Sequence, residues 1–201
     1  VKVGPNPDGI TVANGRIYTA DTDGMNWPSQ STSVSVIDIN SFKFEKTITV
    51  SLNPNYIYSD SDGDVYVICM SDYSDDKSYI VQRIDAKTDE VKTVEGIKAY
   101  KMTVADDIAY IMFNDYYANE VKFYKYDLKN EKLLSDNFIT DGTVVSSPNG
   151  IGVDPVTGDI YVGKSNKKNN GDVYIFSSEG KLKSQFETLP YPSEFVFMTN
   201  K

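Results

Sequence analysis

Short apolar runs alternate with polar, turn-forming residues along the whole chain, as in Gly9-Ile10-Thr11-Val12 and Val34-Ser35-Val36-Ile37. A period of two residues is typical of β-strands, because successive side chains point to opposite faces of a sheet. No stretch of useful length shows the period of about 3.6 residues that an amphipathic helix requires. The pattern therefore predicts an all-β protein built from short strands.

One short motif recurs: an apolar residue, then tyrosine, then β-forming residues. Its tyrosines stand at intervals of 48, 44 and 51 residues and are Tyr18, Tyr66, Tyr110 and Tyr161. Each motif follows an apolar segment and a turn such as Asn14-Gly15, whose residues tolerate the positive φ of a tight hairpin. A period of about 40–50 residues with four strands per unit is typical of β-propeller blades. The sequence therefore predicts a β-propeller of four-stranded antiparallel blades, with about four blades present.

The repeat also sets the expected boundaries. We expect a single propeller domain or propeller fragment over 1-201, with blades at roughly 6-50, 53-95, 97-140 and 148-187 and a final inner strand at 192-198. The faces of a blade are apolar and need neighbours to cover them. The sequence therefore favours part of a larger ring of about seven blades, completed by missing blades or a second copy, over a closed four-bladed ring.

Composition narrows the chemistry. The chain has no His, which removes the Ser-His-Asp and Cys-His arrangements and the His-based zinc sites. Its 20 basic and 29 acidic residues give a net charge of −9, which opposes nucleic-acid binding. Lys164, Lys167 and Lys168 lie close together in the sequence and are interpreted as part of a solvated loop. The single Cys69 lies in an apolar strand pattern and is interpreted as a buried, inert thiol.

Two segments carry a family resemblance. Residues 7–21, from Pro7-Asp8-Gly9 onward, and residues 148–163, from Pro148-Asn149-Gly150 onward, resemble YncE-like and NHL-type β-propellers. The resemblance covers nearly the whole chain. In the two middle units Tyr56 and Lys101 replace the Gly of this motif, and Ala99 replaces the Pro.

The resemblance carries an expectation about location. Propellers of this kind are often exported bacterial proteins, including surface-layer-like lipoproteins that capture nutrients, and one such group binds cobalamin. The resemblance thus implies a protein of the cell surface or periplasm. No apolar run reaches the ~18 residues of a membrane-spanning helix. The chain begins with Val, so we expect a processed or trimmed N-terminus that leaves room for a lipid anchor on the missing part.

Candidate binding residues lie in the loops that enter the first strand of each blade and those that leave the second strand. In a propeller these loops meet at one axial mouth, and loops on a rigid scaffold commonly carry function. The candidates are Asp21, Asp23, Asn26, Trp27, Asn55, Tyr73, Tyr100, Asn114, Asp115, Tyr116, Tyr117, Asn149, Lys164 and Asn166. Trp27, Tyr116 and Tyr117 form the leading cluster, because exposed aromatic rings stack on flat ligands or sugar faces. Alternatively, Trp27 pins its own loop or a neighbouring blade.

Two acidic segments invite a Ca²⁺ interpretation. Asp60-Ser61-Asp62-Gly63-Asp64 offers oxygens at alternate positions but lacks the EF-hand register, so it is interpreted as a hairpin turn. Asp21-Thr22-Asp23-Gly24 lies at the expected mouth. We assign no catalytic residue, metal site or cofactor, and leave Ca²⁺ open.

These observations predict a non-catalytic exported protein that holds a small-molecule or surface-protein ligand at the axial mouth. One alternative is a metal-dependent hydrolase or lactonase. Ser147-Pro148-Asn149-Gly150 is similar to the Asn-Gly turn of gluconolactonase-type propellers, where Asn and acidic residues hold a divalent ion. The resemblance implies that Asn149, Asn55 and Asp8 would hold such an ion in this chain. A second alternative is a structural surface or interaction scaffold, because a fold does not fix a function.

Overall fold

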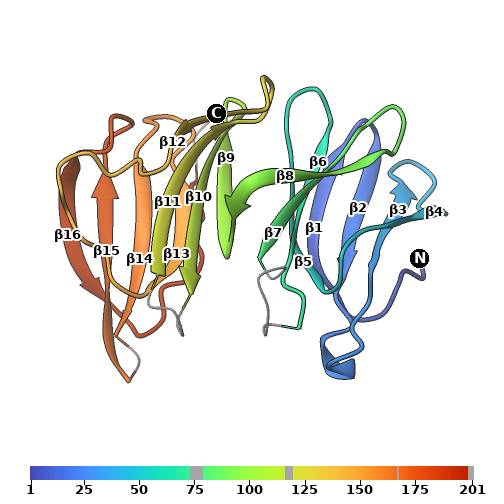
Figure 1. Ribbon diagram of the computed structural model, residues 1–201, viewed down its shortest axis with the longest axis horizontal. Helices are drawn as coiled ribbons and strands as arrows, with labels where there is room; N and C mark the ends of the chain where they lie inside the picture. Colours follow the sequence, from blue (N-terminus) through green and yellow to red (C-terminus); the bar gives the residue numbers. More distant parts are fainter. Residues whose placement is uncertain (73–78, 116–119, 167, 199–201) are drawn as a thin grey trace. The chain divides into compact units, whose positions relative to one another are not determined.

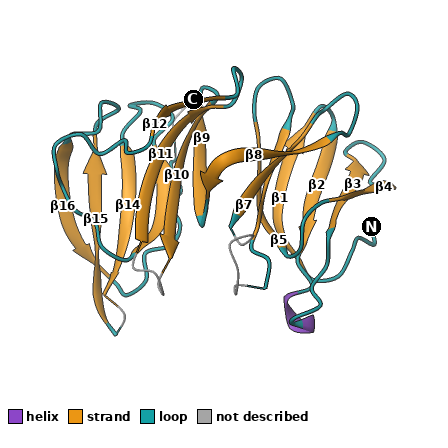
Figure 2. Ribbon diagram, in the orientation of Figure 1, coloured by secondary structure: helices purple, strands orange, loops and turns teal. Residues whose placement is uncertain are grey.

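The computed structural model describes residues 1–201 apart from 73–78, 116–119, 167 and 199–201. The described residues form four four-stranded antiparallel sheets and one short 3₁₀ helix, η1 (Gly24–Asn26) (Figures 1 and 2). The all-β architecture and the four sheets predicted from the sequence are confirmed. By its contacts the chain divides into two compact units, Val1–Ala99 and Tyr100–Lys201, and each contains two sheets.

The sheets are called blades 1 to 4 below. In the first unit, blade 1 contains β1 (Pro7–Ala13), β2 (Arg16–Asp21), β3 (Ser33–Asp38) and β4 (Phe44–Thr49). Blade 2 contains β5 (Pro54–Ser59), β6 (Val65–Cys69), β7 (Ile80–Ile84) and β8 (Val91–Lys98). In the second unit, blade 3 contains β9 (Lys101–Ala105), β10 (Ile108–Asp115), β11 (Glu120–Asp127) and β12 (Lys132–Ser135). Blade 4 contains β13 (Pro148–Val153), β14 (Ile160–Asn166), β15 (Asn169–Phe176) and β16 (Leu182–Thr188).

Within every blade the strands pair in chain order, so each blade is an antiparallel meander. The four repeat tyrosines all lie in the second strand of a blade, which confirms that the tyrosine-marked segments are equivalent. The β1–β2 turn has φ values of 48° at Asn14 and 72° at Gly15. Two consecutive positive φ values are what a two-residue hairpin turn requires, so the expected turn chemistry is present.

In the first unit, the core lies between blades 1 and 2. Tyr18 and Val36 pack in one cluster with Val67 and Cys69, all of them buried. β5 packs on β1 and β2. The approach is close, because a Cβ added at Gly9 would lie 2.5 Å from the Asn55 carbonyl oxygen. The glycine of the Pro-x-Gly motif therefore makes room for the first strand of the next blade.

In the second unit, β13 packs on β9 and β10 in the same manner. The core between blades 3 and 4 also takes in Phe138, from the connection between β12 and β13. Its ring makes edge contacts with Tyr110 at 5.5 Å, Phe123 at 5.4 Å and Phe176 at 6.3 Å between centroids. Edge-to-face aromatic packing stabilises a core beyond the burial of area alone.

Residues 192–198, expected as a final inner strand, are not assigned to a strand, because no described strand pairs with them. The segment lies on blade 4 instead. The Phe195 and Phe197 rings contact Tyr161 at 5.8 and 5.1 Å. Nζ of the buried Lys101 donates to the Ser193 carbonyl at 3.0 Å and pairs with Glu194 at 2.5 Å. In the described part of the chain, no helix is long and apolar enough to cross a membrane.

Candidate functional site

The connection between β2 and β3, residues 22–32, is the longest connection within blade 1, and it contains η1. The Asn26 side-chain amide donates to the Asp23 carboxylate at 3.2 Å and to the Ser29 carbonyl at 3.1 Å. Thr22 Oγ1 donates to the Pro54 carbonyl at 2.8 Å, next to Asn55. The loop is therefore fixed both internally and to the start of blade 2.

This fixed loop presents two large apolar side chains to solvent. Met25 is 89% exposed and Trp27 is 64% exposed. Trp27 Nε1 donates to the Asp72 carbonyl at 3.4 Å, so one edge of the indole faces Asp72, which follows β6 of blade 2. Beside the loop lies a hollow of about 310 Å³, lined by Asn6, Pro7, Asp8, Thr22, Gly24 and Met25. The exposed Trp27 thus both contacts the neighbouring blade and stays open to a ligand.

Asp21, a candidate ligand residue, is fully buried at the end of β2. Its carboxylate accepts hydrogen bonds from Thr19 Oγ1 at 3.0 Å, Ser33 Oγ at 3.0 Å and Ser35 Oγ at 2.7 Å. A buried carboxylate needs such partners, because burial without hydrogen bonds is costly. The structure therefore places Asp21 inside blade 1, where it joins β2 to β3.

Two buried amide oxygens close to this loop, Gln30 Oε1 and Asn53 Oδ1, have no hydrogen-bond partner among the described residues. The Asn53 backbone N–H donates to the Ser31 carbonyl at 2.8 Å, which places Asn53 at the base of the loop. Its side-chain amide donates to the Ser71 carbonyl at 2.9 Å. Buried oxygens of folded proteins normally accept a hydrogen bond. The base of the loop therefore has unused acceptor capacity.

In the second unit, the candidate residues are held along the ends of blades 3 and 4. The Asn114 side-chain amide donates to the Pro148 carbonyl at 3.1 Å, which joins the end of β10 to β13 beside Asn149. The Tyr100 backbone N–H, just before β9, donates to the Met112 carbonyl at 2.7 Å. Tyr100, Asp115 and Asn149 are half-buried.

A second hollow, of about 490 Å³, lies at the end of blade 4. Its lining residues are Ser146, Ser147, Lys164, Ser165, Asn166, Asn169, Asn170 and Glu187. The Asn166 amide donates to Asp172 at 3.1 Å and to the Asn170 carbonyl at 2.8 Å. Lys164 Nζ lies 3.8 Å from Asp172 Oδ2. The structure thus brings together two of the candidate residues, Lys164 and Asn166.

Several lining residues were not predicted. Asn169 and Asn170 belong to the polar run after β14, where only their proximity to Asn166 in sequence could have drawn attention to them. Glu187 joins the hollow through the β15–β16 register, in which Asp172 lies opposite Glu187. Met25, between Asp23 and Trp27, could not be predicted, because a lone apolar residue in a polar loop gives no pattern.

The candidate set falls into two groups. Asp21, Asp23, Asn26, Trp27 and Asn55 belong to the first unit. Tyr100, Asn114, Asp115, Asn149, Lys164 and Asn166 belong to the second. Tyr73, Tyr116 and Tyr117 lie outside the described residues. Convergence of the two groups on one axial mouth stays a prediction.

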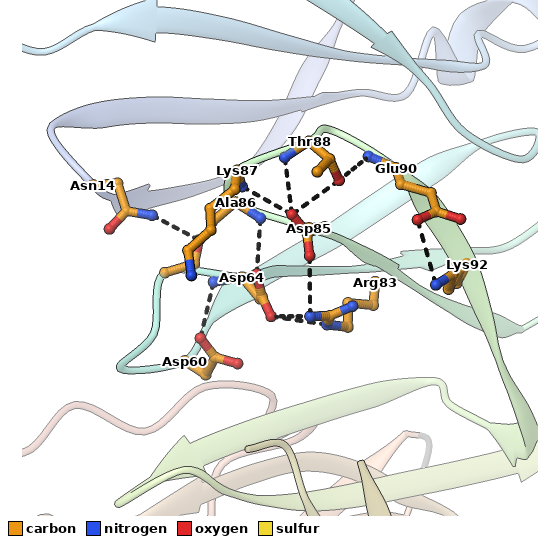
Figure 3. Close-up of polar contacts among 11 residues, drawn as sticks. Asn14, Asp60, Asp64, Arg83, Asp85, Ala86, Lys87, Thr88, Glu90 and Lys92 are labelled. Atoms are coloured by element: carbon orange, nitrogen blue, oxygen red, sulfur yellow. Dashed lines mark hydrogen bonds and ion pairs between the residues drawn. The ribbon is translucent and has the colours of Figure 1, made fainter. Parts of the chain in front are cut away.

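The acidic segment 60–64 forms a turn whose carboxylates contact the protein itself (Figure 3). Asp60 accepts the Asp64 backbone N–H at 2.9 Å. Asp64 pairs with Arg83 and accepts the Ala86 N–H at 2.8 Å. Across the described residues, no group of three or more His, Cys, Asp or Glu side chains is placed to hold a metal ion. The carboxylates of this segment therefore join the β5–β6 turn to the β7–β8 turn.

Two ionisable groups have strongly shifted pKa values. Burial raises the pKa of the Cys69 thiol to about 12. A thiol with so high a pKa is protonated at neutral pH and is a poor nucleophile. The backbone N–H groups of Thr88 and Lys87 lower the pKa of Asp85 to about 2 (Figure 3). Both environments are structural, and neither group lines either of the two hollows described above.

The four antiparallel four-stranded meanders define the class: the chain has the β-propeller fold, and solved structures agree. A quinonprotein alcohol dehydrogenase-like protein from Bacteroides thetaiotaomicron matches with TM-score 0.64 and 17% identity over 92% of this chain and 47% of that chain. The Dos1 propeller matches with TM-score 0.64 and 12% identity over 92% of this chain and 47% of that chain. Kuenenia stuttgartiensis hydrazine synthase matches with TM-score 0.63 and 15% identity over 86% of this chain and 51% of that chain.

At these identities the likeness shows the fold alone. The chain spans about half the length of the solved structures described above. No family model and no curated protein matches the sequence.

Proposed function

We propose that this chain is a non-catalytic binding module of the propeller class, exported to the cell surface or periplasm and related to the YncE-like and NHL-type propellers. Its ligand, a small molecule or a surface protein, binds at the loop end of blade 1. One observation carries the proposal: a fixed loop exposes Trp27 and Met25 beside a hollow of about 310 Å³.

The physical support is the combination of exposure and order. Large apolar side chains in solvent are unfavourable for a free protein, and grouped ones commonly mark an interaction site. The bonds from Asn26 to Asp23 and from Thr22 to the Pro54 carbonyl hold this loop before a ligand arrives. A pre-ordered loop loses less conformational entropy on binding, so more of the contact energy contributes to affinity.

Trp27 is the only tryptophan of the chain, so its fluorescence reports directly on this loop. A panel of saccharides, corrinoids, nucleosides and peptides is titrated into the protein. We expect at least one class to shift or quench the Trp27 emission with saturation. Met25→Ala should weaken that response, because Met25 lines the hollow.

The matched control is Phe42→Ala, since Phe42 is 62% exposed but lies in the β3–β4 turn. This variant should bind like the unmodified protein. A silent Trp27 across the panel, together with no heat of binding by calorimetry, contradicts the proposal. So does a response that Met25→Ala and Phe42→Ala weaken equally.

A further inference from the structure

The two hollows occupy equivalent places in their blades. Each lies between the residues that lead into the first strand and the C-terminal end of the second: Asn6 and Thr22, which follows β2, in blade 1, and Ser147 and Ser165, which lies in the last residues of β14, in blade 4. The register confirms the equivalence, because Pro7 lies opposite Asp21 and Pro148 lies opposite Lys164. The hollow of blade 4 is therefore built by the fold at a fixed position of the repeat.

Its lining has the chemistry of hydroxyl recognition. Three side chains carry hydroxyls, three carry amides, and the remaining two are an ammonium and a carboxylate. Hydroxyl and amide groups both donate and accept hydrogen bonds, which matches the dual character of alcohol groups. We propose that the blade 4 hollow binds a neutral, hydroxyl-rich ligand, namely a mono- or disaccharide.

The charges around the hollow favour a neutral ligand over an ionic one. The Lys164 ammonium already faces the Asp172 carboxylate at 3.8 Å. Glu187 accepts the Asn170 amide at 2.9 Å and adds negative charge on the same side of the blade. An anionic ligand would be repelled by Asp172 and Glu187 and a cationic ligand by Lys164, and the charges that would attract each of them already have partners in Lys164, Asp172 and the Asn170 amide. Neutral hydroxyls can donate to Glu187 and accept from Lys164 without either repulsion.

Size and order agree with this assignment. The hollow of about 490 Å³ lies within the range of about 300–1,000 Å³ that is usual for small-molecule sites. The Ser165 backbone N–H donates to the Ser147 carbonyl at 3.0 Å, which joins the two sides of the hollow. Asn166 and Asn170 are oriented by their bonds to Asp172 and Glu187. Oriented amides lose little freedom when they bind a ligand.

The inference goes beyond the proposed function, because it assigns a ligand class to a second site, which includes Lys164 and Asn166 of the same candidate set. It is independent of Trp27, which belongs to the other unit. The test therefore needs a readout in each unit.

The full chain, labelled with ¹⁵N, is titrated with maltose, lactose, glucuronate and glucosamine to about 10 mM, enough to detect binding with Kd near 1 mM. We expect maltose or lactose to shift the side-chain amide signals of Asn166, Asn169 and Asn170, and the two charged sugars to bind more weakly. Lys164→Met should weaken the neutral-sugar affinity about tenfold or more, as expected for loss of a hydrogen bond from a charged donor.

Lys183→Met is the matched control. Lys183 is also a lysine of blade 4, but it pairs with Asp159 away from the hollow, so its removal should leave the affinity unchanged. Asn169→Phe fills the hollow from an exposed position and should also abolish binding, which keeps the test valid if Lys164→Met folds poorly.

Three results overturn the inference. Shifts caused only by glucuronate or glucosamine refute the neutral class, and shifts that avoid the three asparagines refute the site. A Trp27 response without asparagine shifts overturns the inference and leaves the proposed function standing. Asparagine shifts with a silent Trp27 support the hollow and contradict the loop of blade 1 as the binding element.

Discussion

Blades 1 and 4 differ most at one equivalent position, the residue that ends the pairing between the first and second strands. In blade 1 this residue is Asp21, fully buried among three hydroxyl donors. In blade 4 it is Lys164, which lines a hollow and whose side chain is 23% exposed and faces Asp172 on the adjacent strand. In blade 2 it is Cys69, buried and apolar in character. The side chain at this position is therefore hydrogen-bonded inside the blade in blade 1, packed as an apolar group in blade 2, and part of the lining of a hollow in blade 4.

Removal of the Asp21 carboxylate should give the largest effect. Asp21→Ala leaves the hydroxyls of Thr19, Ser33 and Ser35 without their shared acceptor. We expect the free energy of unfolding of the first unit to fall by about 3 kcal/mol, because buried unpaired polar groups are costly. Urea unfolding followed by Trp27 fluorescence measures it. Asp21→Asn keeps one acceptor oxygen and should lose clearly less; equal losses for the two variants would break the contrast with blade 4.

Blade 4 depends instead on a close backbone approach. Gly180 has φ 80°, and an added Cβ would lie 1.6 Å from the Phe138 carbonyl oxygen. Gly180→Ala should lower the free energy of unfolding by about 2 kcal/mol or more, since it adds a clash to the strain of positive φ. Gly158→Ala, at φ 71° with its nearest atom 3.8 Å away, carries only the strain and should cost about 1 kcal/mol. Thermal unfolding of the two variants side by side tests the difference.

Lys164→Met should change stability by less than about 1 kcal/mol, in contrast to Asp21→Ala. The Lys164–Asp172 pair is partly exposed, spans 3.8 Å and is screened by solvent, so it contributes little. Urea unfolding in low and high salt measures this small loss. A loss of unfolding free energy as large as that of Asp21→Ala would mean that Lys164 is a buried structural group like Asp21, and it would contradict the contrast between the two blades.

The smallest expected effect is on the pH dependence of stability in acid. Because the Asp85 pKa is lowered from 3.8 to about 2, its stabilising bonds are present in full above pH 4 and are lost as the pH falls towards 2. Asp85→Asn should therefore remove part of the decline in stability between pH 4 and pH 2. The melting temperature of the variant and the unmodified protein across that interval checks the sign. A variant with a steeper decline would contradict it.

Much of the fold could be predicted, because its signals are local. Alternation marks the strands, and Asn14-Gly15 supplies the φ values of a tight turn. Tyr18, Tyr66, Tyr110 and Tyr161 mark the second strand of each blade. The role of Phe138 could not be predicted, since a connecting residue enters the core only when two sheets are already packed.

The site was predicted less well, for a related reason. Asp21 and Lys164 are both charged residues at the end of a strand, so the sequence alone does not distinguish their environments. Only the side chains opposite them show that Asp21 is a buried acceptor and that Lys164 lines a hollow. Ser33 and Ser35 lie beside Asp21, whereas Asp172 faces Lys164. Glu187 enters the lining through strand register alone. Such information comes from pairing between segments and not from any single segment.

Carboxyl footprinting of the folded protein, followed by mass spectrometry, tests the contrast between the two blade ends most directly. The account predicts that Asp21 stays unlabelled until the first unit unfolds, while the part-exposed Asp172 beside the blade 4 hollow is labelled in the native state. Labelling of native Asp21 at the rate of Asp172 would contradict it.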